Sequence, residues 1–276
     1  MRISHADVDF LGEIKVSALL GLLEQTAVEA SAASGFDPAR YTELGRVWLV
    51  RRTRLERLTP VGGGDVLRVS THVADFRRAR SLRRYTVRRT EGLEPRPEAD
   101  AVRATTDWVY CDVDSGHPVS VPDEMKLALF GTTEAPSEGR AARVETPDEP
   151  PAASFPLQVR PSHLDHMLHV NNATWADFLE DAALALLENR GLTLDTMLDR
   201  GGALRIASLD LEYLGDARQG QTLAIRTWIE SGQDDLGRGP TLVHEALAPD
   251  NRRLLRARGR WAWRQRPDVL GGVPVR

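Results

Sequence analysis

The sequence is poor in cysteine, in long apolar runs and in net charge, and each shortage excludes a class of protein. The single cysteine, Cys111, permits neither an internal disulfide framework nor a cysteine-based zinc site. No stretch approaches the roughly 20 apolar residues of a membrane span, and the N-terminus lacks the apolar core of a signal peptide. A formal net charge of −4 argues against a nucleic-acid binder. We therefore expect a cytoplasmic globular protein without membrane or nucleic-acid partners.

The chain does contain an internal repeat, in which one sequence unit occurs twice. A shift of 156 positions superimposes like residues over roughly sixty positions: Asp9 on Asp165, Glu24 on Glu180, Gly35 on Gly191, Leu55 on Leu211 and Val69 on Ile225. Residues 131–154 are rich in Pro, Glu, Ala and Ser, a composition typical of linkers. We predict an N-terminal domain over 1–130, a linker over 131–154 and a C-terminal domain over 155–276.

Each copy begins with a pattern of helical period. In the second copy one apolar face comprises Trp175, Phe178, Leu179, Ala182, Ala183, Leu186 and Leu187. Asn171 or Asn172 is suited to cap this helix, and Gly191 to end it. The first copy repeats the stripe with Leu19, Leu22, Leu23, Thr26, Ala27 and Ala30, with Ser17 as the expected cap and Gly35 as the end.

After each helix only strand-like runs follow. They cover 46–58, 64–75, 81–90 and 100–112 in the first copy, and 203–214, 219–230, 241–248 and 253–264 in the second. One helix followed by several strands favours an antiparallel α+β layer over a βαβ fold. A sheet wrapped around one long helix is the hotdog fold, so the chain is predicted to be a double hotdog.

The most polar cluster of the chain, HLDHMLHVNN (163–172), directly precedes the second helix. One explanation is helix capping. The other is chemical: a carboxylate or imidazole there could activate water, while free N–H groups at the helix end stabilise an oxyanion. Asp165 and His169 are the candidate bases. His163 and His166 flank Asp165, but this irregular segment is a poor tetrahedral shell, so we expect no metal.

Several motifs together resemble the acyl-acyl carrier protein (acyl-ACP) thioesterase family. They are HVNN before an amphipathic helix, VWLVRRTRLERLTPVGGGD (47–65), and RATTDWVYCD (103–112) with PDEMK (122–126) after it. The resemblance implies a catalytic second hotdog in which Asp165 and His169 act together with a later carboxylate, aligned here as Asp216. Met167 replaces an asparagine of the family pattern. Ala217 stands where plant members carry a cysteine, which excludes a cysteine nucleophile at that position.

The resemblance also implies a substrate and different roles for the two hotdogs. The partner is an acyl carrier protein or acyl-CoA, the product a fatty or related acid of lipid metabolism, and no cofactor is required. Substrate contacts are expected from Asn171, Asn172, Met167, Leu23 and Ala27, with the first hotdog shaping an apolar acyl pocket. The chain is expected to be a monomer or a homodimer of double hotdogs. Acyl length stays open.

Three further expectations remain to be tested. The repeat offset puts Glu13 on His169, and Lys15 and Val16 on the two asparagines, so the first copy is predicted to be catalytically inactive. The basic run 76–89 is either the solvated face of a strand or a docking patch for an acidic carrier. The alternatives to hydrolysis are a hotdog that binds acyl thioesters without turnover and, less favoured, a hydratase or dehydratase.

Overall fold

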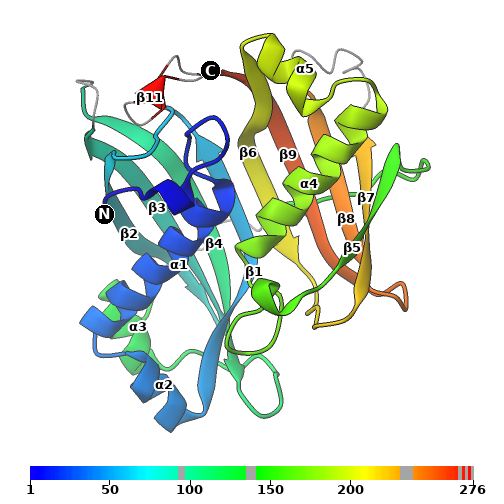
Figure 1. Cartoon of the computed structure of the whole chain (residues 1–276). Helices are drawn as coiled ribbons and strands as arrows, with labels where there is room; N and C mark the ends of the chain where they lie inside the picture. The colour runs from blue at the N-terminus through cyan, green and yellow to red at the C-terminus, as the bar shows by residue number, and fades with distance from the viewer. Residues whose placement is uncertain (93–96, 135–140, 231–238, 267–268, 271–272, 275–276) are drawn as a thin grey trace.

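The computed structural model describes residues 1–92, 97–134, 141–230, 239–266, 269–270 and 273–274. Within these residues one long antiparallel sheet carries two long helices on the same side (Figure 1). The predicted α+β class and the double hotdog are confirmed.

The first half supplies three helices and four strands of the main sheet. The helices are α1 (Val16–Ala33), α2 (Pro38–Leu44) and α3 (Asp123–Phe130). The strands are β1 (Arg46–Arg57), β2 (Val66–Arg77), β3 (Arg80–Glu91) and β4 (Ala99–Asp112). A 3₁₀ turn over His5–Asp7 precedes them. The predicted strands of this half lie within two residues of the observed ones.

The second half repeats the design with one additional strand. Its helices are α4 (Thr174–Asn189) and α5 (Leu194–Asp199), after a 3₁₀ turn over Pro161–His163. Its strands are β5 (Ala153–Gln158), β6 (Gly202–Tyr213), β7 (Thr222–Ile229), β8 (Thr241–Leu247) and β9 (Arg253–Gln265). A short hairpin follows, β10 (Val269–Leu270) with β11 (Val273–Pro274).

The two halves share a single sheet because β1 pairs with β6. The strand order is β2-β3-β4-β1-β6-β9-β8-β7-β5, all antiparallel. The Arg52 guanidinium reinforces the junction by donating from Nε and Nη2 to the two carboxylate oxygens of Asp210, both at 2.6 Å. This forked geometry is the strongest arrangement of such a pair.

The two long helices bury the faces that their sequences predict. The seven predicted apolar residues of α4 are all buried, and so are Leu19, Leu23 and Ala27 of α1. Gly35 and Gly191 end the helices with φ of 87° and 80°, a conformation that favours glycine. The predicted Ser17 cap is wrong. The N-cap is Lys15, whose N–H bonds the carbonyl of Asp7. The helix begins at Val16, so Ser17 lies inside its first turn.

Several short elements have no signal in the sequence pattern. The helices α2, α3 and α5 are too short for a clear helical period. Helices α2 and α3 cover a small second core of Phe36, Val73, Phe76, Tyr110, Val121 and Met125. Strand β5 begins at Ala153, inside the predicted linker.

The predicted linker lies partly outside the described residues, at 135–140. Its described residues 141–152 form no helix or strand, but they pack against the sheet. Arg52 donates to the carbonyl of Ala142, and the Trp228 indole N–H donates to the carbonyl of Glu149 at 2.7 Å. The three-part division of the chain stays a prediction.

Arginines of the basic run 76–89 have partners within the chain. Arg80 pairs with Asp107, Arg88 with Asp100 and Arg89 with Asp65. Arg83 is buried, so it is not available to a macromolecular partner. These contacts favour the structural interpretation of the run over the docking interpretation. No helix in the described part of the chain is long and apolar enough to span a membrane.

A buried histidine on β8 gives the fold a test by pH. His244 is 1% exposed, contacts the Thr227 hydroxyl at 3.0 Å, and has its pKa lowered by burial to about 3. The unfolded chain binds a proton below pH 6.5 at this residue and the folded chain does not. Stability is therefore lost as the pH falls below 6.5, by up to about 1.4 kcal/mol per pH unit.

We predict that His244→Gln removes this part of the acid sensitivity. Urea unfolding at pH 7, 6 and 5 should give a shallower pH dependence in His244→Gln than in the wild type. The matched control is His72→Gln on β2, whose side chain is exposed and which should keep the wild-type slope. Equal slopes in all three proteins would contradict the assignment.

Candidate active site

The loop before α4 is organised by the carboxylate of Asp165. Its Oδ1 accepts hydrogen bonds from the backbone N–H of Met167 at 2.8 Å and of His169 at 3.3 Å. Between them Leu168 adopts φ of 62°, a left-handed conformation that is uncommon outside glycine. One oxygen of Asp165 is thus engaged in forming the loop that presents His169. Only the other oxygen, Oδ2, is left to contact a substrate or water.

His169 forms a cluster with two residues that follow β6. Its Nε2 lies 3.4 Å from Oδ2 of Asp216 and 2.9 Å from Nη2 of Arg218. Arg218 also donates from Nε to Asp216 at 3.0 Å. The same imidazole nitrogen therefore has a partner in either protonation state. A neutral Nε2 accepts from Arg218, and a protonated Nε2 donates to Asp216.

Electrostatics keeps Asp216 ionised. Burial raises the pKa of its carboxyl, but the hydrogen bond from Arg218 and the nearby His169 outweigh burial and lower the pKa overall. Arg252 adds a more distant cation at 3.9 Å. Asp216 is consequently a weak base and a good counterion for an imidazolium.

The two asparagines that follow have separate structural partners. The side-chain oxygen of Asn171 accepts from the N–H of Ala173 at 2.8 Å. Ala173 is the N-cap of α4 and no side chain that the structure describes caps the helix, so the prediction that Asn171 or Asn172 is the cap is wrong. The carbonyl of Asn172 accepts from the Tyr213 hydroxyl at 3.0 Å. The N–H of Thr174 bonds the carbonyl of Asn171. Among the described residues, no acceptor bonds the N–H of Asn172 or of Trp175.

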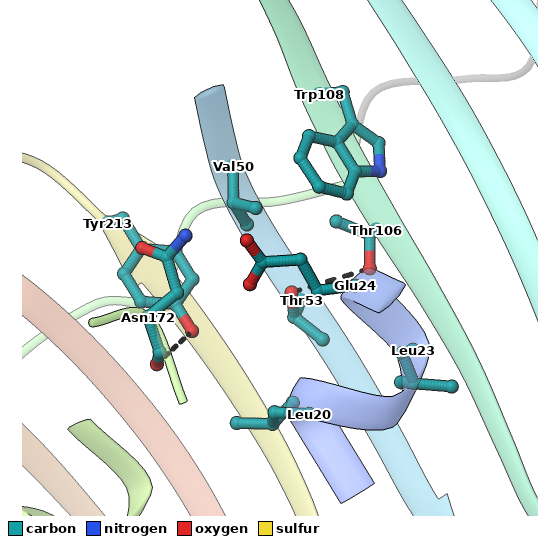
Figure 2. Close-up of a pocket in the computed structure, with 9 residues that line it drawn as sticks. All are labelled: Leu20, Leu23, Glu24, Val50, Thr53, Thr106, Trp108, Asn172 and Tyr213. Atoms are coloured by element: carbon teal, nitrogen blue, oxygen red, sulfur yellow. Dashed lines mark hydrogen bonds between the residues drawn. The ribbon is translucent and has the colours of Figure 1, made fainter. Parts of the chain in front are cut away.

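A small cavity of about 20 Å³ lies beside this helix end, at the contact between the halves. It is lined by Leu20, Leu23, Glu24, Val50, Thr53, Thr106, Trp108, Asn172 and Tyr213. Figure 2 shows the Glu24 side chain of α1 between Asn172 and Tyr213 on one side and Trp108 and Thr106 on the other. The volume has room for about one water molecule, so an acyl chain must displace side chains to enter.

The predicted substrate contacts are distributed unevenly around this cavity. Leu23 and Asn172 line it. Ala27 is buried but is not part of the lining, and Met167 is 39% exposed on the loop. The lining combines the aliphatic side chains of Leu20, Leu23 and Val50 with the polar side chains of Glu24, Thr53, Thr106 and Asn172.

Three residues of the site escaped the sequence analysis: Arg218, Tyr213 and Glu24. Arg218 follows the aligned carboxylate by two positions, and its contact with His169 depends on the course of the loop after β6. Glu24 had a signal, because it is the repeat mate of Glu180, but the repeat alone does not indicate a role at the site. The predicted cysteine-free mechanism keeps its basis, since Cys111 is buried on β4 with its pKa raised by burial.

The first half contains the symmetric counterpart of this site, closed by arginines. Oδ1 of Asp9 accepts from the N–H groups of Leu11 and Glu13, as Asp165 does in its own loop. Oδ2 of Asp9 accepts from Arg205 at 2.8 Å, and the same guanidinium donates to Glu180 at 2.8 Å. Arg57 pairs with Glu13. A buried ion cluster fills the position that a substrate would need.

Comparison with known proteins decides the family. Residues 1–129 match the model of the acyl-ACP thioesterase N-terminal domain, and residues 159–264 match that of the thioesterase-like superfamily. The chain belongs to the acyl-ACP thioesterase family. It is accordingly a thioester hydrolase, and this membership does not favour the alternative of a binding protein without turnover. No curated protein is similar enough in sequence to count as a match.

Solved structures of similar fold cover nearly the whole chain. A Lactobacillus plantarum protein described as an oleoyl thioesterase has a TM-score of 0.74 at 18% identity, over 97% of this chain and 95% of its own. The 12:0-ACP thioesterase from Umbellularia californica has a TM-score of 0.71 at 17% identity, over 96% of each chain. An acyl-ACP thioesterase from Bacteroides thetaiotaomicron scores 0.72 at 16% identity, over 95% of each. These likenesses establish the double-hotdog fold.

We predict that Asp9→Asn destabilises the thioesterase by about 3–5 kcal/mol, because Arg205 then loses one of its two buried counterions. The expectation from sequence, that the first copy is catalytically inactive, concerns turnover, whereas this prediction concerns stability. Urea unfolding measures the loss. The control Asp250→Asn, whose carboxylate is 68% exposed, should stay within about 0.5 kcal/mol of the wild type. A stable Asp9→Asn variant with collapsed kcat would instead place the chemistry in the first half.

Proposed function

We propose that the protein hydrolyses acyl-ACP with His169 as general base, Asp216 as its counterion and Asp165 as the residue that shapes the loop. The observation that supports this assignment is the position of His169 Nε2 between Asp216 and Arg218, next to the N-terminal end of α4. Asp216 stands in for the family glutamate, one methylene shorter.

In the proposed reaction, water replaces the Arg218 N–H at Nε2 of His169. The Arg218 side chain is 63% exposed, so it is able to move aside. The imidazole takes a proton from water as the oxygen attacks the thioester carbon, and the imidazolium is stabilised by Asp216. When the tetrahedral intermediate collapses, the C–S bond breaks and the leaving sulfur receives that proton. The products are a carboxylic acid and a free thiol.

The oxyanion of the intermediate is assigned to the helix end. The N–H groups of Asn172 and Trp175 lie where the partial positive charge of α4 is greatest. Preorganised donors of this kind contribute about 100- to 1,000-fold each to the rate. Of the two explanations considered for the polar cluster, this proposal takes the chemical one: Asn171 holds the turn before α4, and its neighbours use the helix end.

The carrier is assigned as an acidic protein rather than free CoA. Arg160, Arg218 and Arg252 are exposed around the His169 loop, and such a basic rim steers association with an acidic partner. The same arginines suit the phosphate that links a carrier protein to its acyl-bearing thiol. Whether the thioesterase acts as a monomer or a homodimer stays a prediction.

We predict that His169→Ala lowers kcat for acyl-ACP about 100- to 10,000-fold, the usual contribution of a general base. Asp216→Asn should lower kcat more than it raises KM, because the counterion acts on the charged transition state. To test Asp165, the variant Asp165→Asn is better suited than Asp165→Ala, because the side-chain amide oxygen of asparagine still accepts the two loop N–H groups. Thiol release from an acyl-ACP panel measures the rates. Cys111→Ser is the control and should retain turnover, and activity of His169→Ala near the wild-type level would refute the assignment.

The cluster also predicts a pH shift. Arg218→Gln removes the hydrogen bond and charge that lower the pKa of Asp216, so that pKa rises. If ionised Asp216 is required, the acid limb of the kcat profile moves to higher pH in Arg218→Gln. The control Arg190→Gln, at the far end of α4, should keep the wild-type profile. An unmoved acid limb in Arg218→Gln would show that Asp216 does not act in the reaction.

A further inference from the structure

Polar groups without partners lie in and around the cavity beside the helix end, among them the half-buried Glu24. Among the described residues, the Glu24 carboxylate forms no hydrogen bond or ion pair. The Trp108 indole N–H, which lines the cavity, and the Tyr85 hydroxyl, which lies near Trp108 and Thr106 outside the lining, also form no hydrogen bond of good geometry, although Trp108 is only 9% exposed and Tyr85 only 3%. Buried polar groups in folded proteins are nearly always paired, so a cluster of exceptions requires an explanation.

The repeat shows that this lack of partners is specific to one position. Glu180 is the residue in the second copy that matches Glu24, and Arg205 neutralises it. Arg57 occupies in the first copy the position that Tyr213 occupies at the open cavity, and it pairs with Glu13. The fold is thus able to supply an arginine against a carboxylate at this place. At Glu24 it supplies none.

The charged and titratable groups around Glu24 come from three other elements. They are Asp165 and His166 of the loop before α4, Tyr213 of β6 and Tyr85 of β3. Burial, together with Asp165, raises the pKa of Glu24. Thr53 and Thr106 hydroxyls lie 3.4 Å apart in the same wall, at the limit of a hydrogen bond. The surroundings therefore offer Glu24 no strong donor and leave room for one from a ligand.

An unbranched alkyl chain is a poor occupant of such a cavity. It would remove water from Glu24, Trp108 and Tyr85 and give them nothing in exchange, and an unpaired buried polar group is strongly unfavourable. A hydroxyl group is a better occupant, because its O–H donates to the carboxylate while its oxygen accepts from an N–H or O–H. The observed set, one acceptor with two donors nearby, matches that requirement.

We propose that the acyl group hydrolysed by this thioesterase carries a hydroxyl group, and that Glu24 is the specificity residue that binds it. The inference rests on the proposed function, in which the thioester lies at the end of α4 and the acyl chain enters the cavity past Asn172. The first hotdog then contributes to selectivity through a polar contact in addition to the shape of its apolar stripe.

The test compares thioesters of equal chain length on ACP. The panel has the plain acyl chain and chains hydroxylated at successive carbons, and kcat/KM is measured for the wild type, Glu24→Gln and Glu24→Leu. We expect the wild type to prefer one hydroxyacyl substrate at least tenfold over the plain chain. Glu24→Leu should abolish or invert that preference, and Glu24→Gln should retain part of it. The control Glu29→Gln, exposed on the same helix, should behave as the wild type.

Two results would overturn the inference. One is a wild type that prefers the plain chain over every hydroxylated one. The other is a Glu24→Leu variant that loses activity equally on all substrates with an unchanged melting temperature, which would make Glu24 part of the chemistry. Absence of turnover on the whole panel would count against the proposed function. In that case binding of non-hydrolysable amide analogues, hydroxylated against plain, still decides the specificity by calorimetry.

Discussion

Five residue pairs, from Arg52 opposite Glu212 to Glu56 opposite Ser208, join the two hotdogs into one sheet. Each hotdog alone would leave a strand edge whose N–H and C=O groups lack partners, and the pairing of β1 with β6 removes both edges at once. It also sets the distance between α1 and α4. A slip of one residue would turn every side chain of these strands to the opposite face. The contacts between halves exist only in this register.

Two such contacts between the halves are related by the internal repeat, but the carboxylates are neutralised by an arginine at only one of them. At one, a carboxylate loop and a helix glutamate converge on Arg205, and the charges cancel in a dry interior. At the other, Asp165 and Glu24 approach with no arginine between them, beside the helix end that we assign to catalysis. The same backbone arrangement thus forms a stabilising ion cluster at Arg205 and an open cavity at Glu24. The difference lies in a few side chains of β1 and β6.

The sequence indicated the elements far better than the contacts between them. Eight strands and both long helices were predictable, because their periodicity is local and repeats in the second copy. Asp165 and His169 stood out as part of the polar cluster before the second helix, Asp216 came only from the family resemblance, and the structure places His169 and Asp216 together. Arg218 and Tyr213 had no local signal, because each acts through a contact with a distant residue, His169 and Asn172, 49 and 41 positions away. The repeat marked Glu24 but not its lack of partners, which depends on the side chains that β1 and β6 bring to the cavity. Helices α2, α3 and α5 were too short to show a period.

The arginine-filled counterpart site also constrains the history of the gene. After duplication, the first copy could lose its imidazole freely, but Arg205 and Arg57 now neutralise carboxylates that the loops still require. Reversion to two working sites would need both arginines and Glu13 to change together, because each single step leaves a buried charge alone. Such epistasis makes the loss practically one-way. Engineering a second working site into the first half would therefore require Arg57, Arg205 and Glu13 to be replaced together.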